Sequence, residues 1–290
     1  MADYKLSPYG FDLGRFAWLI LRPNVTLQKP SGPHDECFPD SGLLEMRSAI
    51  DPELCDLAIK EASAFDSFRR EKGCAIAGSN GRHFRVANLH VVSNAIRRIG
   101  LTDEFHRIAS QFFGGTSTIY TSLYFKHGSQ QAPHIDTPYF WTRPINNFVG
   151  VWVALEDIDE SAGPLVYYAG SHRFFSNEEA LRGVFESAGG NLERMFELME
   201  REIESRCERR VALIRKGDAV IWHPGVLHGG QKATDSARTR YSTVFHFAPL
   251  GINVRDEKSF LKEFWNIPTY GVKREGGNFY CRASLPAAMV

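Results

Sequence analysis

The sequence has no hydrophobic run long enough to cross a membrane. The stretch FAWLIL at residues 16–21 is far shorter than the roughly 20 apolar residues that a spanning helix needs. The segment MADYKLSPYGFDLGRF that leads into it is polar, and no basic stretch precedes an apolar run as in a secretory signal. We therefore expect a soluble, cytoplasmic protein without membrane insertion.

An excess of charge of either sign is also missing. The 290 residues hold 34 Lys and Arg against 34 Asp and Glu, so the formal net charge is zero when the histidines are neutral. No overall field would draw such a protein to nucleic acid or to an anionic membrane. The balance favours a small-molecule substrate, predicts no nucleic-acid partner and leaves the oligomeric state open.

Cysteine is sparse and shows no pairing. The five cysteines are scattered without C-x-x-C spacing, at Cys37, Cys55, Cys74, Cys207 and Cys281. An odd, dispersed set is typical of free thiols in a reducing compartment, rather than of a disulfide framework or a zinc ribbon.

Internal repeats and Pro/Gly/Ser-rich linkers are absent as well, so we predict a single domain over residues 1–290. Residues 1–115 are predicted to be a helical N-terminal part that supports the core. There, Asp51 and Pro52 suit the N-cap and first turn of one helix, and Gly114 suits the end of another. The core follows at residues 116–250, and residues 251–290 form a C-terminal extension.

From residue 116 onward, the sequence contains short segments rich in β-branched and aromatic residues. Gly, Pro, Asp or Ser bounds them, and no helices of the βαβ type separate them. We predict strands at residues 116–126, 148–157, 164–170, 210–215, 218–223 and 240–247. This pattern indicates a mainly β fold with flanking helices, built as an antiparallel sandwich or barrel.

A helical insertion at residues 174–208 interrupts the predicted strands. Ser176 and Glu179 form a capping-box pattern, and the charged stretch from Glu193 to Arg210 predicts an exposed helix. The insertion is either a surface excursion or a lid that helps to close a substrate pocket.

A candidate metal site begins at the triplet His134-Ile135-Asp136. On an extended strand, residues two apart point to the same face, so His134 and Asp136 could converge on one ion. Downstream, His223 and His228 bracket Pro-Gly, and His228 precedes a Gly-Gly pair that would let the backbone approach a ligand closely. Two histidines and one carboxylate are the ligand set of non-haem Fe(II) oxygenases. The residues favour His228 and leave His223 as the alternative.

A candidate anion site lies in the segment ARTRYSTVFHF. If residues 240–247 form a strand, then Arg240, Ser242, Val244 and His246 share one face. A guanidinium followed two residues later by a hydroxyl suits a bidentate grip on the carboxylate of a cosubstrate. The alternative is that Arg240 is a surface charge at a strand edge, as we expect for Arg238.

Four segments in this order and with these gaps resemble the phytanoyl-CoA dioxygenase family of Fe(II)- and 2-oxoglutarate-dependent oxygenases: HIDTPYF, VWVALEDIDESAGPLVYYAGSHR, KGDAVIWHPGVLHGG and RTRYSTVFHFA. The likeness covers roughly residues 116–250. It implies a double-stranded β-helix (jelly-roll) core with His134, Asp136 and His228 as metal ligands. It also implies that Arg240 binds the cosubstrate, with Arg238 as a rival, and that Ser242, Tyr124 and Gln131 are further contacts.

The cofactors implied by this resemblance are Fe(II), 2-oxoglutarate as cosubstrate and O2. The implied reaction is hydroxylation of a C–H bond, with succinate and CO2 as co-products. Asp136 favours hydroxylation because related halogenases carry a small residue at the carboxylate position. The sequence has no obvious basic cluster that would bind the diphosphate of CoA. We therefore expect a small polar metabolite or a sugar-containing substrate. The alternatives are a cupin-like metalloenzyme that does not use 2-oxoglutarate and a non-catalytic metal-binding jelly-roll module.

Overall fold

The structure is a computed structural model that describes residues 32–71, 85–142, 144–250 and 270–283. The N-terminal segment with FAWLIL lies outside the described residues. Within the described ranges, no helix has the length and apolar character needed to span a bilayer.

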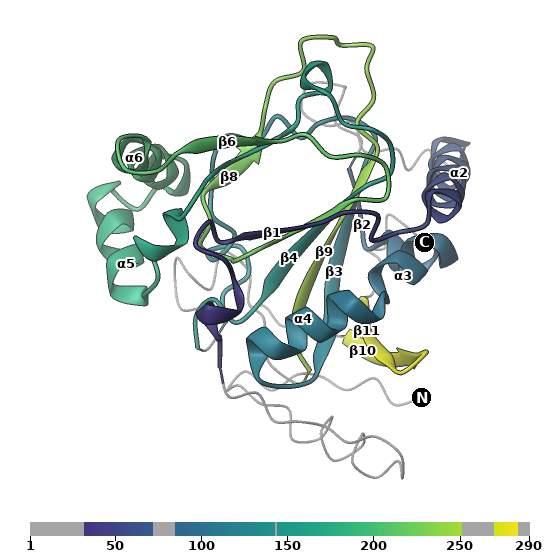
Figure 1. Cartoon of the computed structure of the whole chain (residues 1–290), viewed down its shortest axis with the longest axis horizontal. Coiled ribbons are helices and arrows are strands. Elements are labelled where there is room, and N and C mark those ends of the chain that lie inside the picture. Colours follow the sequence, from purple (N-terminus) through teal and green to yellow (C-terminus); the bar gives the residue numbers. More distant parts are fainter. Residues whose placement is uncertain (1–31, 72–84, 143, 251–269, 284–290) are drawn as a thin grey trace.

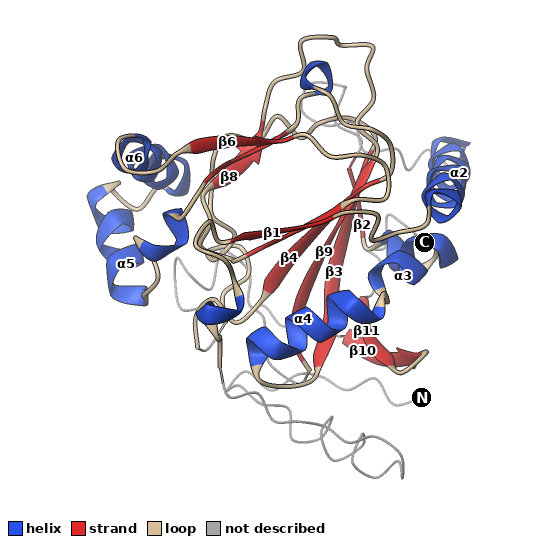
Figure 2. Cartoon of the chain, viewed as in Figure 1, coloured by secondary structure: helices blue, strands red, loops and turns tan. Residues whose placement is uncertain are grey.

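A large sheet forms one wall of the molecule (Figures 1 and 2). Its strand order is β1-β7-β4-β9-β3-β11-β10, and β2 also pairs with β3. The pairs from β1 to β3 are antiparallel, whereas β11 pairs with β3 in parallel. The bounds are β1 Leu43–Met46, β2 Arg85–Ala87, β3 Ser117–Phe125, β4 Val149–Ala154, β7 Ala219–Trp222, β9 Ser242–Pro249, β10 Tyr270–Glu275 and β11 Asn278–Ala283.

A small sheet faces the large one across the barrel (Figure 2). Its order is β6-β5-β8, with β5 at Leu165–Tyr168, β6 at Arg209–Ala212 and β8 at His228–Gly230. A buried apolar layer joins the two sheets, with Trp152 and Val244 from the large sheet and Tyr167 and Ala212 from the small one. The two facing sheets form a double-stranded β-helix, so the predicted fold is confirmed.

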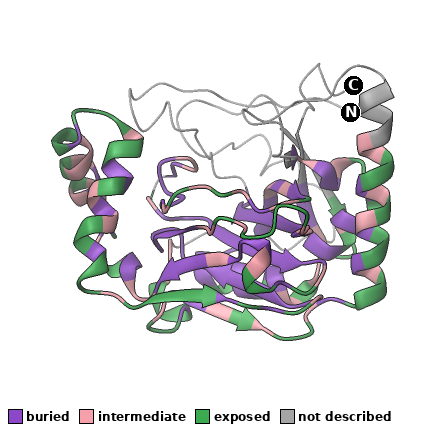
Figure 3. Cartoon of the chain, turned by 90° about the horizontal axis from the view of Figure 1, so that it is seen from above, coloured by how far each residue is buried: buried purple, intermediate pink, exposed green. Residues whose placement is uncertain are grey.

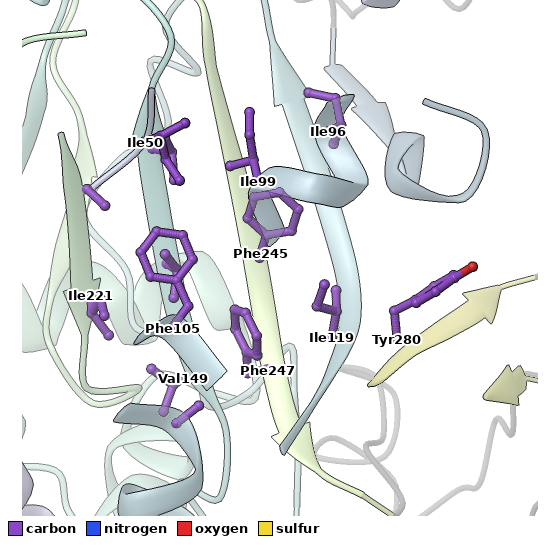
Figure 4. Close-up of a cluster of buried hydrophobic side chains, with 14 of the residues drawn as sticks. Ile50, Ile96, Ile99, Phe105, Ile119, Val149, Ile221, Phe245, Phe247 and Tyr280 are labelled. Atoms are coloured by element: carbon purple, nitrogen blue, oxygen red, sulfur yellow. The ribbon is translucent and has the colours of Figure 1, made fainter. Parts of the chain in front are cut away.

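Three helices cover the outer face of the large sheet: α2 Pro52–Glu71, α3 Asn94–Gly100 and α4 Asp103–Phe113. Figure 4 shows side chains of α3 and α4, among them Ile99 and Phe105, packed on Ile119, Phe245 and Phe247 of the sheet. Because side chains alternate along a strand, the odd-numbered Phe245 and Phe247 face these helices, which leaves Val244 and His246 for the barrel interior. Figure 3 shows the buried sheets between helices whose outer faces are exposed.

The predicted insertion contains α5 Glu178–Ser187 and α6 Leu192–Glu204, beside the small sheet (Figure 1). Asn177, not Ser176, caps α5, because the Asn177 side chain accepts the Ala180 N–H. The apolar faces of both helices bury Ile135 and Leu227 in one cluster. Each of these two residues adjoins a predicted metal ligand, so the insertion packs behind the candidate site.

The outer parts of the chain contain the expected helix ends and also strands that the sequence did not predict. The Asp51 carboxylate accepts a hydrogen bond from the Glu53 N–H at the start of α2. Gly114 ends α4 with its backbone in the left-handed conformation. However, the part expected to be helical also supplies β1 and β2, and the predicted extension supplies β10 and β11. Short 3-10 helices lie at Asp35–Cys37, Leu89–Val91, Glu160–Ala162 and Ser171–Arg173. The division into one domain stays a prediction.

Truncating a buried side chain of the insertion should destabilise the protein. Met199 is fully buried in the cluster around Ile135 and Leu227. We expect Met199→Ala to lower the free energy of unfolding by about 2–5 kcal/mol, through lost burial and a residual cavity. Glu197→Ala, at an exposed position of the same helix, is the matched control and should change it by less than about 0.5 kcal/mol in urea denaturation. Equal effects of the two substitutions would mean that the cluster contributes little.

Candidate metal centre

The backbone brings His134 and His228 directly opposite each other. The two residues form an antiparallel β-bridge. The backbone N–H of each donates to the backbone carbonyl of the other, with N–O distances of 2.8 and 2.9 Å. This bridge extends the small sheet beyond β8 to the segment that carries the His-x-Asp triplet. The Asp136 N–H donates to the Pro224 carbonyl at 3.2 Å, which ties the triplet to the loop before β8.

The three side chains meet in one small volume. One ligand atom from each of His134, Asp136 and His228 lies within 4.8 Å of the other two. The His134 Nε2 is 3.7 Å from Asp136 Oδ1, and the His228 Nε2 is 3.9 Å from Asp136 Oδ2. All three residues are buried. Two imidazoles and one carboxylate converging in this way make the donor set that the sequence predicts.

Hydrogen bonds to nearby carbonyls orient both imidazoles. His134 Nδ1 lies 2.8 Å from the Ala132 carbonyl, and His228 Nδ1 lies 2.9 Å from the Val226 carbonyl. A carbonyl can only accept, so in both rings Nδ1 must carry the proton. This tautomer leaves each Nε2 with its lone pair directed at the site, as in metal-binding histidines.

The environment also sets the protonation states. Burial lowers the pKa of His134 to about 4. Burial acts to raise the pKa of Asp136, but the surrounding imidazoles, first His228 and then His246, outweigh it and hold that pKa below its usual value. A neutral imidazole and an ionised carboxylate are the forms that coordinate a metal.

Two further side chains contact Asp136, and neither was assigned a role from the sequence. The Trp222 Nε1–H donates to Asp136 Oδ2 at 2.9 Å, and His246 Nε2 lies 3.6 Å from the same oxygen. The alternation along residues 240–247 placed His246 on the same face as Arg240, and this was the only signal for it.

The site opens into a cavity of about 520 Å³ between the two sheets. The triad lines this cavity together with Arg240, Gln131 and aromatic side chains. Arg240 is 4% exposed, and its backbone N–H donates to the Lys126 carbonyl just before β9 begins. The cavity therefore joins the candidate metal ligands and the candidate anion-binding residue.

The Arg240 guanidinium is buried without a counter-charge. One Nη1–H donates to the Gly163 carbonyl at 2.8 Å, and the group lies 5.6 Å from the Trp152 ring centroid. Its Nε is buried with no hydrogen-bond partner, and no carboxylate within the described residues forms an ion pair with it. Burial lowers the pKa of Arg240 to about 10, so the group remains cationic at neutral pH. A buried cation of this kind has the chemistry of an anion site.

Of the other predicted cosubstrate contacts, one lines the cavity and two do not. Gln131 lines the cavity. Tyr124 does not, because Leu123 and Phe125 of the same strand face the cavity and the alternation directs Tyr124 into the cluster under the helices. Ser242 is buried outside the lining, and its hydroxyl donates to the Arg240 carbonyl at 3.3 Å.

The two rival residues lie away from the cavity. His223 is fully buried and its Nε2 is 3.1 Å from Asp35 Oδ1, among the rings of Phe38 and Phe112. Arg238 pairs with Asp159 at 2.9 Å at the surface. Of the two histidines and the two arginines considered, the structure brings His228 and Arg240 together with the triplet.

The sequence model of the phytanoyl-CoA dioxygenase (PhyH) family matches residues 38–240, a range that includes the triad and ends at Arg240. The chain belongs to this family. It is similar to "Phytanoyl-CoA dioxygenase domain-containing protein 1" of Danio rerio, 27% identical over 185 residues, which are 62% of each chain. It is also similar to the human "Phytanoyl-CoA dioxygenase, peroxisomal", 31% identical over 139 residues, which are 48% of this chain and 39% of the human one. The chain thus matches less than two thirds of the length of either relative.

Among solved structures, the chain resembles the non-heme alpha ketoglutarate dependent epimerase SnoN from nogalamycin biosynthesis. The TM-score is 0.55 at 19% identity, with 93% of this chain and 99% of that chain covered. At this identity the likeness concerns the fold, and it confirms the jelly-roll architecture. The family of the chain and the fold of this relative agree with the donor set in the cavity, since two imidazoles and a carboxylate with space beside them suit non-haem Fe(II).

Proposed function

We propose that this protein is an Fe(II)- and 2-oxoglutarate-dependent dioxygenase that hydroxylates a C–H bond of a small polar metabolite or a sugar-containing substrate. Succinate and CO2 would be the co-products. The observation that carries the proposal is the single cavity that holds both the His134–Asp136–His228 set and the uncompensated guanidinium of Arg240. A metal site alone would not distinguish the reaction class, whereas a buried cation beside it requires an anionic partner.

The three ligand residues would hold the iron through two imidazole Nε2 atoms and the Asp136 carboxylate. When bound, iron with 2-oxoglutarate and O2 supplies the oxidation of the substrate C–H bond. The protein's part is to keep both Nε2 lone pairs available through the bonds to Ala132 and Val226, and to keep Asp136 ionised. Burial of all three residues limits the access of water to the reacting groups.

Arg240 would bind the carboxylate of 2-oxoglutarate that is remote from the metal. Its guanidinium is held by the Gly163 carbonyl on one side and by the Trp152 ring, and its other N–H groups make no hydrogen bond within the described residues. A carboxylate there would supply the missing counter-charge in a site shielded from water, where charge-assisted hydrogen bonds are strong. A cupin-like enzyme without 2-oxoglutarate, or a non-catalytic module, would leave this charge uncompensated.

The cavity lining supports a substrate without phosphate groups. Arg240 is the only Arg or Lys among the described residues of the lining, and the cosubstrate would use it. Near the triad, the lining offers the rings of Tyr139 and Phe140 and the polar side chains of Thr121 and Gln131. Flat rings with a few hydrogen-bonding groups suit a sugar ring or a compact polar molecule.

We also propose a reducing compartment, the cytoplasm. Within the described residues, Cys37, Cys55 and Cys207 are free thiols, and burial raises the pKa of Cys55 to about 11. An un-ionised, buried thiol such as Cys55 is inert, so it plays no part in the proposed chemistry.

Fe(II) and 2-oxoglutarate added without oxygen should produce the weak visible charge-transfer band of a chelated keto acid. We expect the band with the wild-type protein and not with Asp136→Ala, which lacks one ligand. The measurement is anaerobic absorption spectroscopy on samples whose folding has been checked by circular dichroism. A folded wild-type protein that gives no band would contradict the proposal. A metabolite screen scored by substrate-dependent succinate release would then identify the substrate.

A further inference from the structure

A row of three residues crosses the floor of the cavity on neighbouring strands. Gly150 of β4 lies opposite Trp222 of β7 on one side and opposite His246 of β9 on the other. The Trp222 and His246 rings both line the cavity and stand nearly perpendicular, with centroids 6.4 Å apart. The residue between them has no side chain.

Gly150 is needed for space and not for backbone conformation. It does not fall among the residues with positive φ, so any amino acid could adopt its backbone geometry. However, a Cβ at this position would lie 2.2 Å from Trp222 Cε2 and 2.3 Å from Trp222 Cζ2. The indole therefore lies across Gly150, in the volume that a side chain would fill.

The indole uses this space to reach Asp136. Its Nε1–H donates to Asp136 Oδ2 at 2.9 Å. From the other side of the row, His246 Nε2 approaches the same oxygen to 3.6 Å, an electrostatic contact longer than a hydrogen bond. The His246 ring is itself held by stacking on Phe140, with centroids 4.1 Å apart. Both nitrogen contacts of the row thus fall on one carboxylate oxygen.

The two oxygens of the carboxylate differ in their hydrogen bonds. Asp136 Oδ1 is 3.7 Å from His134 Nε2, and within the described part of the chain no hydrogen bond reaches it, whereas Oδ2 accepts the Trp222 bond and also lies 3.9 Å from His228 Nε2. An oxygen that accepts the Trp222 bond has one lone pair fewer for coordination, and that bond also resists rotation of the carboxylate.

We propose that the Trp222–Gly150–His246 row is a positioning device that fixes Asp136 with Oδ2 held by the row and Oδ1 turned to the metal. The inference rests on the proposed function, because it presumes that the triad holds iron. Trp222 is the group that contacts the ligand residue. Gly150 acts only through Trp222, by leaving room for the indole, and His246 bounds the carboxylate on the other side.

The test compares Trp222→Phe and Gly150→Ala in Co(II) titrations, because the visible bands of Co(II) report its ligands. Trp222→Phe keeps an aromatic ring but removes the N–H. We expect Co(II) affinity to fall about 10–100-fold, as for other contacts that orient a metal ligand, and the visible spectrum to change. Gly150→Ala should have an effect of the same size, because its Cβ displaces the indole. Gly183→Ala in α5 is the matched control, since an added Cβ there meets nothing within 4 Å and should leave the affinity unchanged.

The double variant separates positioning from general damage. If Gly150 acts through Trp222, then Gly150→Ala in the Trp222→Phe background should lower Co(II) affinity by no more than about twofold, because the bond is already lost. Full additivity of the two losses would overturn the assigned role of Gly150. If Gly150→Ala does not fold, Trp222→Phe alone decides the role of the indole.

Asp136→Ala distinguishes failure of this inference from failure of the proposed function. Wild-type affinity in Trp222→Phe, together with loss of Co(II) binding in Asp136→Ala, would refute the positioning role and leave the metal site standing. Co(II) binding that is absent from the wild type, or unchanged in Asp136→Ala, would instead refute the metal site on which the inference rests.

Discussion

Replacing His228 with Ala should abolish metal binding, whereas the same replacement at His223, five residues earlier, should leave it nearly unchanged. His228 presents Nε2 to Asp136 at 3.9 Å and faces His134 across a backbone bridge, so its removal deletes a ligand. The loss in affinity should exceed the about 10–100-fold typical of an outer contact. Isothermal titration with Co(II) under matched conditions measures both variants.

His223→Ala should instead reduce stability. Its ring is fully buried between Phe38 and Phe112, and its Nε2 bonds Asp35, so the substitution leaves a cavity and removes a polar partner. We expect the free energy of unfolding to fall by about 2–5 kcal/mol, the range for large-to-small changes in a core. A loss of Co(II) affinity in His223→Ala as large as that in His228→Ala would show that the wrong histidine has been assigned.

The predicted strands of the core were found because their local pattern was strong. All six contain runs such as FVGVWVALED and RYSTVFHF, in which β-branched and aromatic residues signal a strand directly. β8 could not be predicted in the same way, since its three residues are His228, Gly229 and Gly230. Its strand geometry comes from pairing with β5 and from the bridge to His134, which are contacts distant in sequence.

The faces of the strands were harder to predict than the strands themselves. Alternation along β3 divides its residues into two sets but does not say which set faces the cavity. Tyr124 was assigned to the cavity and lies on the other face, while Leu123 and Phe125 line it. The register shift between Ile119 and Thr121 also changes which residues of this strand face the cavity. No residue type at these positions predicts such a shift.

The partners of Asp136 depend on register between strands. Trp222 lies 72 residues after Gly150 along the chain, and His246 lies 96 residues after it. Only the pairing of β7, β4 and β9 places the three side by side. The triad and Arg240 could be predicted from the sequence because their residue types and order recur in a family. A glycine that gives space to an indole has no such signature, so the row emerged only from the three-dimensional structure.

Arg240→Ala should weaken 2-oxoglutarate binding strongly and spare the metal. The variant removes the buried cation that would pair with the remote carboxylate, a loss of at least about 2 kcal/mol, or about 30-fold in affinity. In the protein without 2-oxoglutarate, the guanidinium is buried without a counter-charge, so its removal should not reduce stability by a comparable amount. Titration of 2-oxoglutarate into the metal-loaded protein, beside thermal unfolding of the unliganded protein, measures the two effects.

Arg238→Ala is the matched control for this prediction, because Arg238 lies two residues away and pairs with Asp159 at the surface. An exposed pair contributes about 0–1 kcal/mol to stability, and Arg238 does not line the cavity, so 2-oxoglutarate affinity should be unchanged. If Arg240→Ala lost metal and 2-oxoglutarate affinity equally, Arg240 would be a structural residue of the barrel. If Arg238→Ala lost more 2-oxoglutarate affinity than Arg240→Ala, the cosubstrate would bind at the surface beside Asp159. The charge of Arg240 would then have to be balanced by a different anion.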